Sequence, residues 1–144
     1  SDEPLVIVDF AHTPDGMAKV LDSLKEKEIV LVLGAGGDRD RAKRPKMGAM
    51  AQRYAKKIIV TSDNPRSEDP DRIIDEILVG MHASEFLHVK ANRYEAIDLA
   101  LRMRENNEVV VILGKGDETY QEIKGVKYPF DDRVVVRELL AKLG

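Results

Sequence analysis

The sequence predicts an α/β fold in which a mostly parallel sheet is covered by helices on both faces. Short apolar runs rich in β-branched residues recur along the chain, as buried strands require. The segments between them place apolar residues three or four positions apart, which is typical of helices. The two patterns alternate, and parallel strands need such crossover connections. The expected arrangement is Rossmann-like, with a small C-terminal hairpin.

Five apolar runs are expected to form the sheet. They are residues 5–10, 29–34, 57–62, 86–89 and 108–114. Each run is short and almost continuously apolar, as in strands that are buried on both faces. After the last run, the residues around Gly125 resemble a small hairpin, and a final helix is expected over about 131–143.

Four helices are expected between the strands. Their apolar positions are Met17, Val20, Leu21 and Leu24; Met47, Met50, Ala51 and Tyr54; Ile73, Ile74, Ile77, Leu78 and Met81; and Ala96, Ile97, Ala100 and Leu101. Three of these helices have start signals in the sequence. Thr13, Asp69 and Asn92 are cap residues, and Pro14 and Pro70 occupy first helical positions, where no N–H is missed.

Composition limits the possible functions. With 43% hydrophobic and 34% charged residues, the 144 residues are expected to form one soluble domain, and no apolar stretch approaches the about 20 residues that cross a bilayer. The net charge of −3 argues against a broad nucleic-acid-binding surface. The lack of cysteine excludes disulfides and fits a cytoplasmic location. The chain begins without methionine and almost directly on a strand, so it is expected to belong to a longer protein.

Four loops follow predicted strands and hold the unusual residues of the chain. They are "DFAHTPD" (9–15), "GAGGDRDRAKRPK" (34–46), "SDNPRSEDP" (62–70) and "GKGDET" (114–119). In open parallel sheets, ligands bind at the carboxyl ends of the strands. The four loops are therefore the candidate parts of a binding site.

The loop 34–46 combines three glycines with five basic residues. The basic residues are Arg39, Arg41, Lys43, Arg44 and Lys46. Glycines let the backbone approach an anion while guanidinium groups reach it, so the loop is expected to be an anion site. The alternative is a solvated basic helix start. A redox dinucleotide fits poorly, because Arg39 stands where the fingerprint needs its third glycine.

The loops 114–119 and 9–15 each have two interpretations. Lys115, with Asp117 and Glu118 close behind, could line a site for a ligand with an amine and a carboxylate, or the glycines could only form a turn. The loop 9–15 offers Asp9, His12 and Asp15, which are types that bind metal or contact ribose, but its end is also ordinary helix capping. A metallohydrolase would need further histidines nearby, and both others, at 82 and 88, are expected away from the strand ends.

The loop 62–70 divides into two parts. Residues 67–70 are explained as the start of a helix. Asp63, Asn64 and Arg66 are not, and their carboxylate, amide and guanidinium are complementary to an ammonium and a carboxylate on one small molecule. Pro65 would hold the loop extended. An amino acid is therefore the expected ligand.

Taken together, "DFAHTPD", "GGDRDRAKRPKMG", "DNPRSEDP" and "GKGDETYQ" resemble, in order and spacing, the C-terminal domain of the Mur ligases. "DNPR" with "GGDRD" is typical of the branch that adds the third residue of the peptidoglycan stem peptide, the UDP-N-acetylmuramoyl-tripeptide synthetases. The resemblance covers nearly all of the chain.

The resemblance implies a cytoplasmic ATP-dependent amide ligase. Such an enzyme activates the carboxylate of UDP-N-acetylmuramoyl-L-alanyl-D-glutamate as an acyl phosphate and joins it to meso-diaminopimelate or lysine. Residues 1–144 would be the C-terminal, amino-acid-binding domain of a three-domain protein. A central domain would hold ATP, Mg²⁺ and the catalytic residues, and an N-terminal domain the UDP-sugar. The chain has no GxxxxGK[ST] motif, so alone it is expected to bind without catalysing.

The resemblance also implies residue roles. The amino-acid-binding set would be Arg39, Asp63, Asn64, Pro65, Arg66, Gly114 and Glu118, and the nucleotide-facing pair would be Asp9 and His12. Arg66 and Asn64 would hold a carboxylate, and Asp63 and Glu118 an ammonium. No metal site is expected in this domain.

One position departs from the family pattern GKGHE, because Asp117 replaces the histidine. A second acid beside Glu118 would disfavour the distal carboxylate of diaminopimelate and favour lysine, whereas "DNPR" goes with diaminopimelate. Two alternatives from other classes also stay open. They are a freestanding module that binds an amino acid or nucleotide, and a metal-dependent hydrolase that uses Asp9, His12 and Asp15.

Overall fold

The computed structural model of the protein describes residues 5–143, whose centre is a five-stranded, wholly parallel sheet. The strands are β1 (Leu5–Asp9), β2 (Glu28–Leu33), β3 (Lys57–Val60), β4 (Leu87–Val89) and β5 (Glu108–Leu113). They lie in the order β1-β5-β2-β3-β4. This arrangement confirms the predicted α/β fold.

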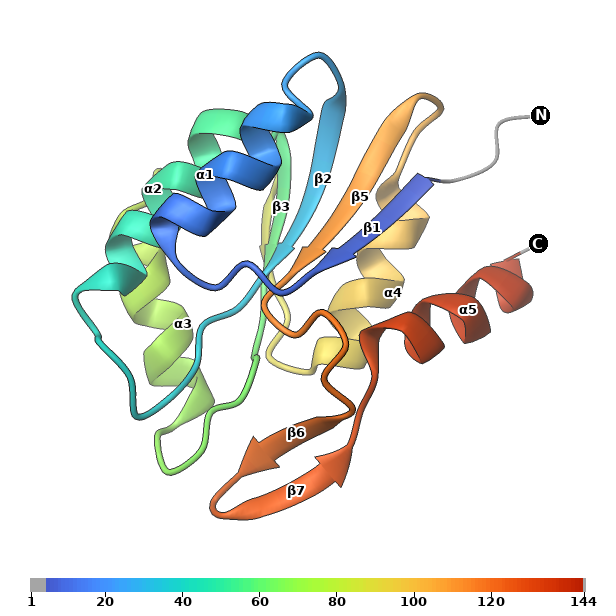
Figure 1. Ribbon diagram of the computed structural model, residues 1–144. Helices are drawn as coiled ribbons and strands as arrows, with labels where there is room; N and C mark the ends of the chain where they lie inside the picture. Colours follow the sequence, from blue (N-terminus) through green and yellow to red (C-terminus); the bar gives the residue numbers. More distant parts are fainter. Residues whose placement is uncertain (1–4, 144) are drawn as a thin grey trace.

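Helices cover both faces of the sheet (Figure 1). They are α1 (Pro14–Ser23), α2 (Lys43–Tyr54), α3 (Pro70–Leu78), α4 (Arg93–Met103) and α5 (Asp132–Leu143). The first three pack on one face, where Leu31 points, and the last two pack on the other, where Val30 and Val32 point. Continuous apolar strands supply both cores at once because successive side chains alternate between faces.

The predicted caps are present. Thr13 accepts the N–H of Gly16, Asp69 accepts that of Asp71, and Asn92 accepts that of Glu95. The strands end one or two residues before most predicted boundaries. After β5 the reason is Gly114, whose φ of 117° turns the chain away from the sheet. Among residues 5–143, no helix has the length and apolar character that a membrane span requires.

The predicted hairpin is formed by β6 (Tyr120–Ile123) and β7 (Val126–Pro129), which pair antiparallel. It lies beyond the carboxyl edge of the sheet (Figure 1). The main chain of Arg66 is bonded to it, because the Arg66 N–H donates to the Glu122 carbonyl at 2.9 Å and the Lys124 N–H donates to the Arg66 carbonyl at 2.7 Å. The hairpin therefore fixes the loop that follows β3.

A buried ion pair ties the second helical layer to the carboxyl edge. Arg93, at the start of α4, donates from Nε and Nη2 to the carboxylate of Asp132 at 2.8 and 2.7 Å. The same guanidinium donates to the carbonyls of Ser62 at 2.9 Å and Leu113 at 3.2 Å. Both charged side chains are fully buried. Arg93 thus holds the ends of β3 and β5 in place, where two of the candidate loops begin.

Candidate functional site

The four candidate loops enclose a cavity of about 380 Å³ at the carboxyl edge of the sheet. The predicted residues that line it are Arg39, Asp63, Asn64, Arg66, Gly114, Glu118 and His12. Pro65 and Asp9 are not brought to this cavity. Residues that lie far apart in the sequence therefore meet in one place, as expected for the carboxyl ends of parallel strands.

Asp63 forms a buried, negatively charged part of the lining. Its carboxylate packs against Gly114, where a Cβ would lie only 2.7 Å from Oδ2. Oδ1 lies 3.3 Å from Nζ of Lys115 and has no hydrogen-bond partner in the described chain. Buried polar atoms without a partner are rare and costly. Asp63 therefore brings a carboxylate charge to the cavity, held between Gly114 and Lys115.

Asn64 presents a donor to the cavity. Its Oδ1 accepts from Nζ of Lys115 at 2.7 Å and from the N–H of Glu122 at 2.9 Å, which uses both lone pairs. Its Nδ2 lies 3.4 Å from Oε1 of Glu118. This network assigns the amide orientation, so the available function of Asn64 is to donate from nitrogen.

Arg66 is held in an unusual backbone conformation with a φ of 52°. Its Nη1 donates to the carbonyl of Gly37 at 2.9 Å, and its Nε lies 3.4 Å from a carboxylate oxygen of Glu122. Left-handed backbone is uncommon for residues other than glycine and often marks a constrained functional position. The guanidinium is half-buried beside the cavity, with a carboxylate already next to it.

Pro65 contributes to the loop rather than to the cavity. Its carbonyl packs so closely on Gly37 that a Cβ there would lie 1.9 Å from the oxygen. The N–H of Gly37 also donates to the Asn64 carbonyl at 2.7 Å. The side chain of Pro65 lines a different, larger cavity of about 790 Å³ between α4, α5 and the hairpin. In the larger cavity, the buried charged residue Arg93 already bonds to Asp132 and to two carbonyls, so its guanidinium is not available to a ligand. The smaller cavity is therefore the candidate site.

Of the two interpretations of the loop 114–119, the structure does not support the one in which Lys115 lines the ligand site. Its side chain is fully buried, and Nζ donates at 2.7 Å to both Oδ1 of Asn64 and the carbonyl of Tyr120. Gly114 and Gly116 both have positive φ and turn the lysine inward. Burial lowers the pKa of Lys115, against the raising effect of Asp63. Lys115 therefore supports the site from behind.

The expectation of an anion site in residues 34–46 is wrong for two of its arginines. Arg44 is buried and donates to Glu68 at 2.7 Å and to Glu76 at 3.0 Å, and Arg41 also pairs with Glu76. The hydrogen bond from Arg44 lowers the pKa of Glu68 to about 2, and that from Arg41 does the same for Glu76. These cations are neutralised within the protein. Glu68, which was expected only to precede a helix, therefore also binds Arg44 and the N–H of Asp38.

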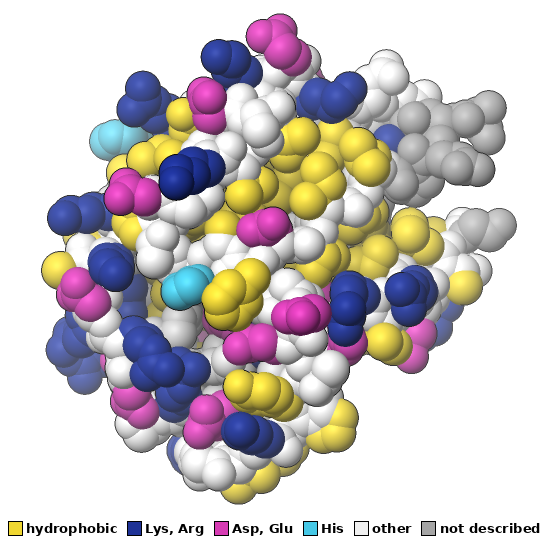
Figure 2. Space-filling view, in the orientation of Figure 1, with side chains coloured by type: hydrophobic (Ala, Val, Ile, Leu, Met, Phe, Trp, Pro, Cys, Tyr) yellow, Lys and Arg dark blue, Asp and Glu magenta, His cyan; other side chains and the backbone are white. Residues whose placement is uncertain are grey.

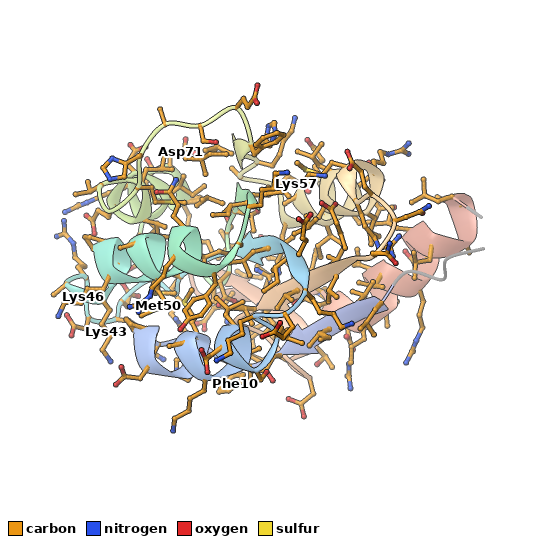
Figure 3. The ribbon with its side chains drawn as sticks, turned by 90° about the horizontal axis from the view of Figure 1, so that it is seen from above. Phe10, Lys43, Lys46, Met50, Lys57 and Asp71 are labelled. Carbon is orange, nitrogen blue, oxygen red and sulfur yellow. The ribbon has the colours of Figure 1, made fainter. Side chains whose placement is uncertain are left out.

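The remaining basic residues of this loop lie nearer the surface. Arg39 and Lys43 line the cavity, and Lys46 is exposed; Figure 3 shows both lysines at the beginning of α2. Figure 2 shows basic and acidic side chains intermixed around this part of the molecule, while hydrophobic side chains gather above it near α1. The loop thus contributes single cations rather than a continuous positive surface.

The loop 9–15 contributes an aromatic edge to the cavity. His12 is exposed, and its ring lies 4.7 Å from that of Phe10, which also lines the cavity. The carboxylate of Asp9 accepts the N–H of Ala11 at 2.8 Å, which stabilises the turn. Within residues 5–143, no group of three histidine or acidic side chains is arranged to hold a metal ion. The loop therefore offers His12 and Phe10 as contact groups.

Two further residues of the site were missed by sequence reasoning or given another role. Glu122 pairs with Arg66 and donates its N–H to Asn64, yet the sequence marks it only as part of a hairpin. Asp117 was expected beside Glu118 in the pocket, but its side chain is exposed and outside the cavity lining. Neither arrangement has a sequence signal, because both depend on how the turn after β5 directs its side chains.

Comparison with known proteins finds relatives along almost the whole chain. A family model described as "Mur ligase, glutamate ligase domain" matches residues 1–116. The UDP-N-acetylmuramoyl-L-alanyl-D-glutamate--2,6-diaminopimelate ligase of Helicobacter hepaticus is 57% identical over 138 residues, which cover 96% of this chain and 30% of the relative. The enzyme of the same name from Aquifex aeolicus is 50% identical, over 97% of this chain and 30% of the relative.

Comparison with solved structures finds the same kind of enzyme. A structure of a UDP-N-acetylmuramoyl-L-alanyl-D-glutamate--2,6-diaminopimelate ligase matches with a TM-score of 0.93 and 44% identity, over 99% of this chain and 30% of that one. A folylpolyglutamate synthase from Thermotoga maritima shares the fold, with a TM-score of 0.56 and 24% identity over 76% of this chain and 24% of that one. The chain thus spans about a third or less of each of these proteins. It belongs to the Mur ligase family, in which it corresponds to the glutamate ligase domain.

Proposed function

We propose that residues 1–144 are the C-terminal, amino-acid-binding domain of a three-domain ATP-dependent ligase. The whole enzyme would join meso-diaminopimelate to UDP-N-acetylmuramoyl-L-alanyl-D-glutamate in the cytoplasm, as a step of peptidoglycan synthesis. The observation that carries the proposal is that Asp63, Asn64, Arg66 and Glu118, from the loops after β3 and β5, line one cavity. The names of the relatives support diaminopimelate as the amino acid.

The cavity has the two kinds of group that an amino acid needs. Asp63 and Glu118 are acceptors for an ammonium group, and Asn64 and Arg66 are donors for a carboxylate. A hydrogen bond to a charged group contributes about 1.5–3 kcal/mol, so a few such contacts suffice for micromolar to millimolar binding. Arg39, at the rim, is a further cation for a ligand carboxylate.

The choice between diaminopimelate and lysine depends on the distal end of the ligand. Diaminopimelate has a second carboxylate there, and lysine has none. The sequence-based reason to favour lysine was Asp117, whose side chain lies outside the cavity lining. Without that acid, Arg39, Lys43 and Arg66 leave the cavity suitable for a ligand with two carboxylates. We therefore assign meso-diaminopimelate.

ATP and Mg²⁺ are proposed to bind mainly in the central domain. ATP would supply the activation of the peptide carboxylate as an acyl phosphate. The described residues have no arranged metal-ligand cluster. In this domain, Asp9 and His12, with Phe10 beside His12, are the groups proposed to face the nucleotide. The contribution of this domain is to hold the attacking amine, because positioning a reactant lowers the barrier to its attack.

The test is amino-acid-dependent phosphate release by the full-length protein, with ATP and the UDP-linked dipeptide present. We expect meso-diaminopimelate to support release at far lower concentration than lysine. Reactions without an amino acid provide the background. Equal or better release with lysine would overturn the assignment of the amino acid, and a lack of release with any amino acid would overturn the proposed ligase activity.

A further inference from the structure

We infer that Lys115 is a positioning residue for the amino-acid site, which fixes the side chains of Asp63 and Asn64 in the orientation that receives the ligand. The inference rests on the proposed function, because it concerns the same cavity. Lys115 does not line that cavity. Its effect on the ligand would therefore be indirect, through the residues that it touches.

The contacts of Lys115 are concentrated on site residues. Nζ lies 2.7 Å from Oδ1 of Asn64, 3.3 Å from Oδ1 of Asp63 and 3.8 Å from Oε1 of Glu118. The other hydrogen bond is to the carbonyl of Tyr120, where the hairpin begins. One ammonium thus connects the loops after β3 and β5 with β6.

Lys115 decides which end of the Asn64 amide faces the ligand. With Nζ and the N–H of Glu122 both donating to Oδ1, the opposite orientation would bring the NH₂ group against two donors. The nitrogen must therefore point toward the cavity and Glu118. Without the ammonium, one of the two reasons for this orientation is lost.

Lys115 also balances the charge of the site. Asp63 and Glu118 are both acidic and both line the cavity, and neighbouring carboxylates repel each other. The ammonium lies near both, so its positive charge offsets their repulsion. Two carboxylates offset by one ammonium leave this part of the cavity with a net negative charge, which suits the ammonium group of the amino acid.

Another buried lysine provides a matched control. Lys57 begins β3, at the opposite edge of the sheet from the cavity, and is labelled in Figure 3. Its Nζ donates to Glu108 at 2.9 Å and to the carbonyl of Met103 at 3.0 Å. Lys57 therefore has a buried ion pair and a main-chain contact, as Lys115 does, but no contact with the candidate site.

The test compares Lys115→Met and Lys57→Met in the full-length enzyme, with the KM of each substrate measured separately. For Lys115→Met, the KM for meso-diaminopimelate is expected to rise by about tenfold or more, as for the loss of an organised charged contact. The KM values for ATP and the dipeptide should change little. Lys57→Met should lower the unfolding temperature without changing the KM for the amino acid. A smaller fraction of folded enzyme lowers the apparent kcat, but the KM of the molecules that remain folded stays the same.

An unchanged KM for the amino acid in folded Lys115→Met would overturn the inference. If that variant does not fold, Asn64→Asp keeps the acceptor for Lys115, replaces the donor with an oxygen and adds a negative charge beside Glu118. It is expected to fold and to raise the same KM by about tenfold, and an unchanged KM would again overturn the inference. Wild-type activity separates the two hypotheses, because an inactive wild type contradicts the proposed function and an active one with unaffected variants contradicts only the role of Lys115.

Discussion

Two buried ion pairs lie close to the same edge of the sheet and differ in how completely they are bonded. In the pair Arg93–Asp132, the guanidinium makes two bonds to the carboxylate and two to carbonyls. In the pair Lys115–Asp63, the ammonium is bonded to other groups and Oδ1 of the aspartate has no hydrogen bond. The first pair is fully hydrogen-bonded within the protein, whereas the second is not and adjoins the candidate cavity.

This difference indicates that Arg93–Asp132 supports the fold and that Lys115–Asp63 belongs to the candidate site. A fully bonded buried pair holds elements together, and Arg93 does so for β3, β5, α4 and α5. A buried polar atom without a hydrogen bond lowers stability, and such atoms are retained mainly at functional positions. Under the proposed function, Asp63 is the buried charge that the protein keeps for binding.

The largest effect is expected from breaking the scaffold pair. Arg93→Met leaves Asp132 charged and buried, which should lower the free energy of unfolding by about 3–5 kcal/mol. The double variant Arg93→Met, Asp132→Leu removes both charges and should recover much of that loss. Urea unfolding measures both. Equal stability of the single variant and the wild type would show that this pair is not a structural support.

A smaller effect is expected at Gly114, which joins the site to β5. Gly114→Ala adds a Cβ 2.7 Å from Oδ2 of Asp63, at a residue whose φ is 117°. The strain should cost about 1–3 kcal/mol, and the displaced carboxylate should raise the KM for the amino acid. Gly125→Ala is the control, because its φ is also positive, at 78°, but no atom lies within 4 Å of the added Cβ. A rise in KM for the control alone would contradict this account.

The smallest effect concerns acid stability and the ion pairs of Arg44. The pKa values of Glu68 and Glu76 are lowered to about 2 from 4.5. Groups with lowered pKa stabilise the fold fully above their ordinary pKa and lose this contribution as the pH falls toward the folded value. Each should contribute on the order of 1 kcal/mol, because both keep some contact with solvent. Unfolding measured between about pH 5 and pH 2 should show this loss, and Arg44→Met should reduce it. An equally steep loss in that variant would assign the acid sensitivity to other groups.

Most of the fold could be predicted from sequence because its signals are local. The strands that begin at Glu28 and Glu108 are continuous apolar runs rich in β-branched residues. The caps Thr13, Asp69 and Asn92 act within one turn of each helix. The position of the site followed from topology, since four unusual loops follow strands of one parallel sheet.

The roles of individual charged residues could not be predicted equally well. Arg44 is neutralised by Glu68 and Glu76, which lie more than twenty residues away in the sequence. Lys115 points inward and Asp117 points outward because Gly114 and Gly116, which flank Lys115, both have positive φ and turn the chain. Such outcomes depend on side-chain direction and on distant partners, which neither composition nor motif spacing contains.

The most direct test of the central claim compares Asp63→Asn with Asp132→Asn in the full-length enzyme. Each variant removes one buried carboxylate charge and keeps the shape of the side chain. We expect Asp63→Asn to raise the KM for meso-diaminopimelate by about tenfold or more, with the smaller loss of unfolding temperature, and Asp132→Asn to give the larger loss of unfolding temperature with little change in KM. The reverse pattern, or an unchanged KM in Asp63→Asn, would contradict the account.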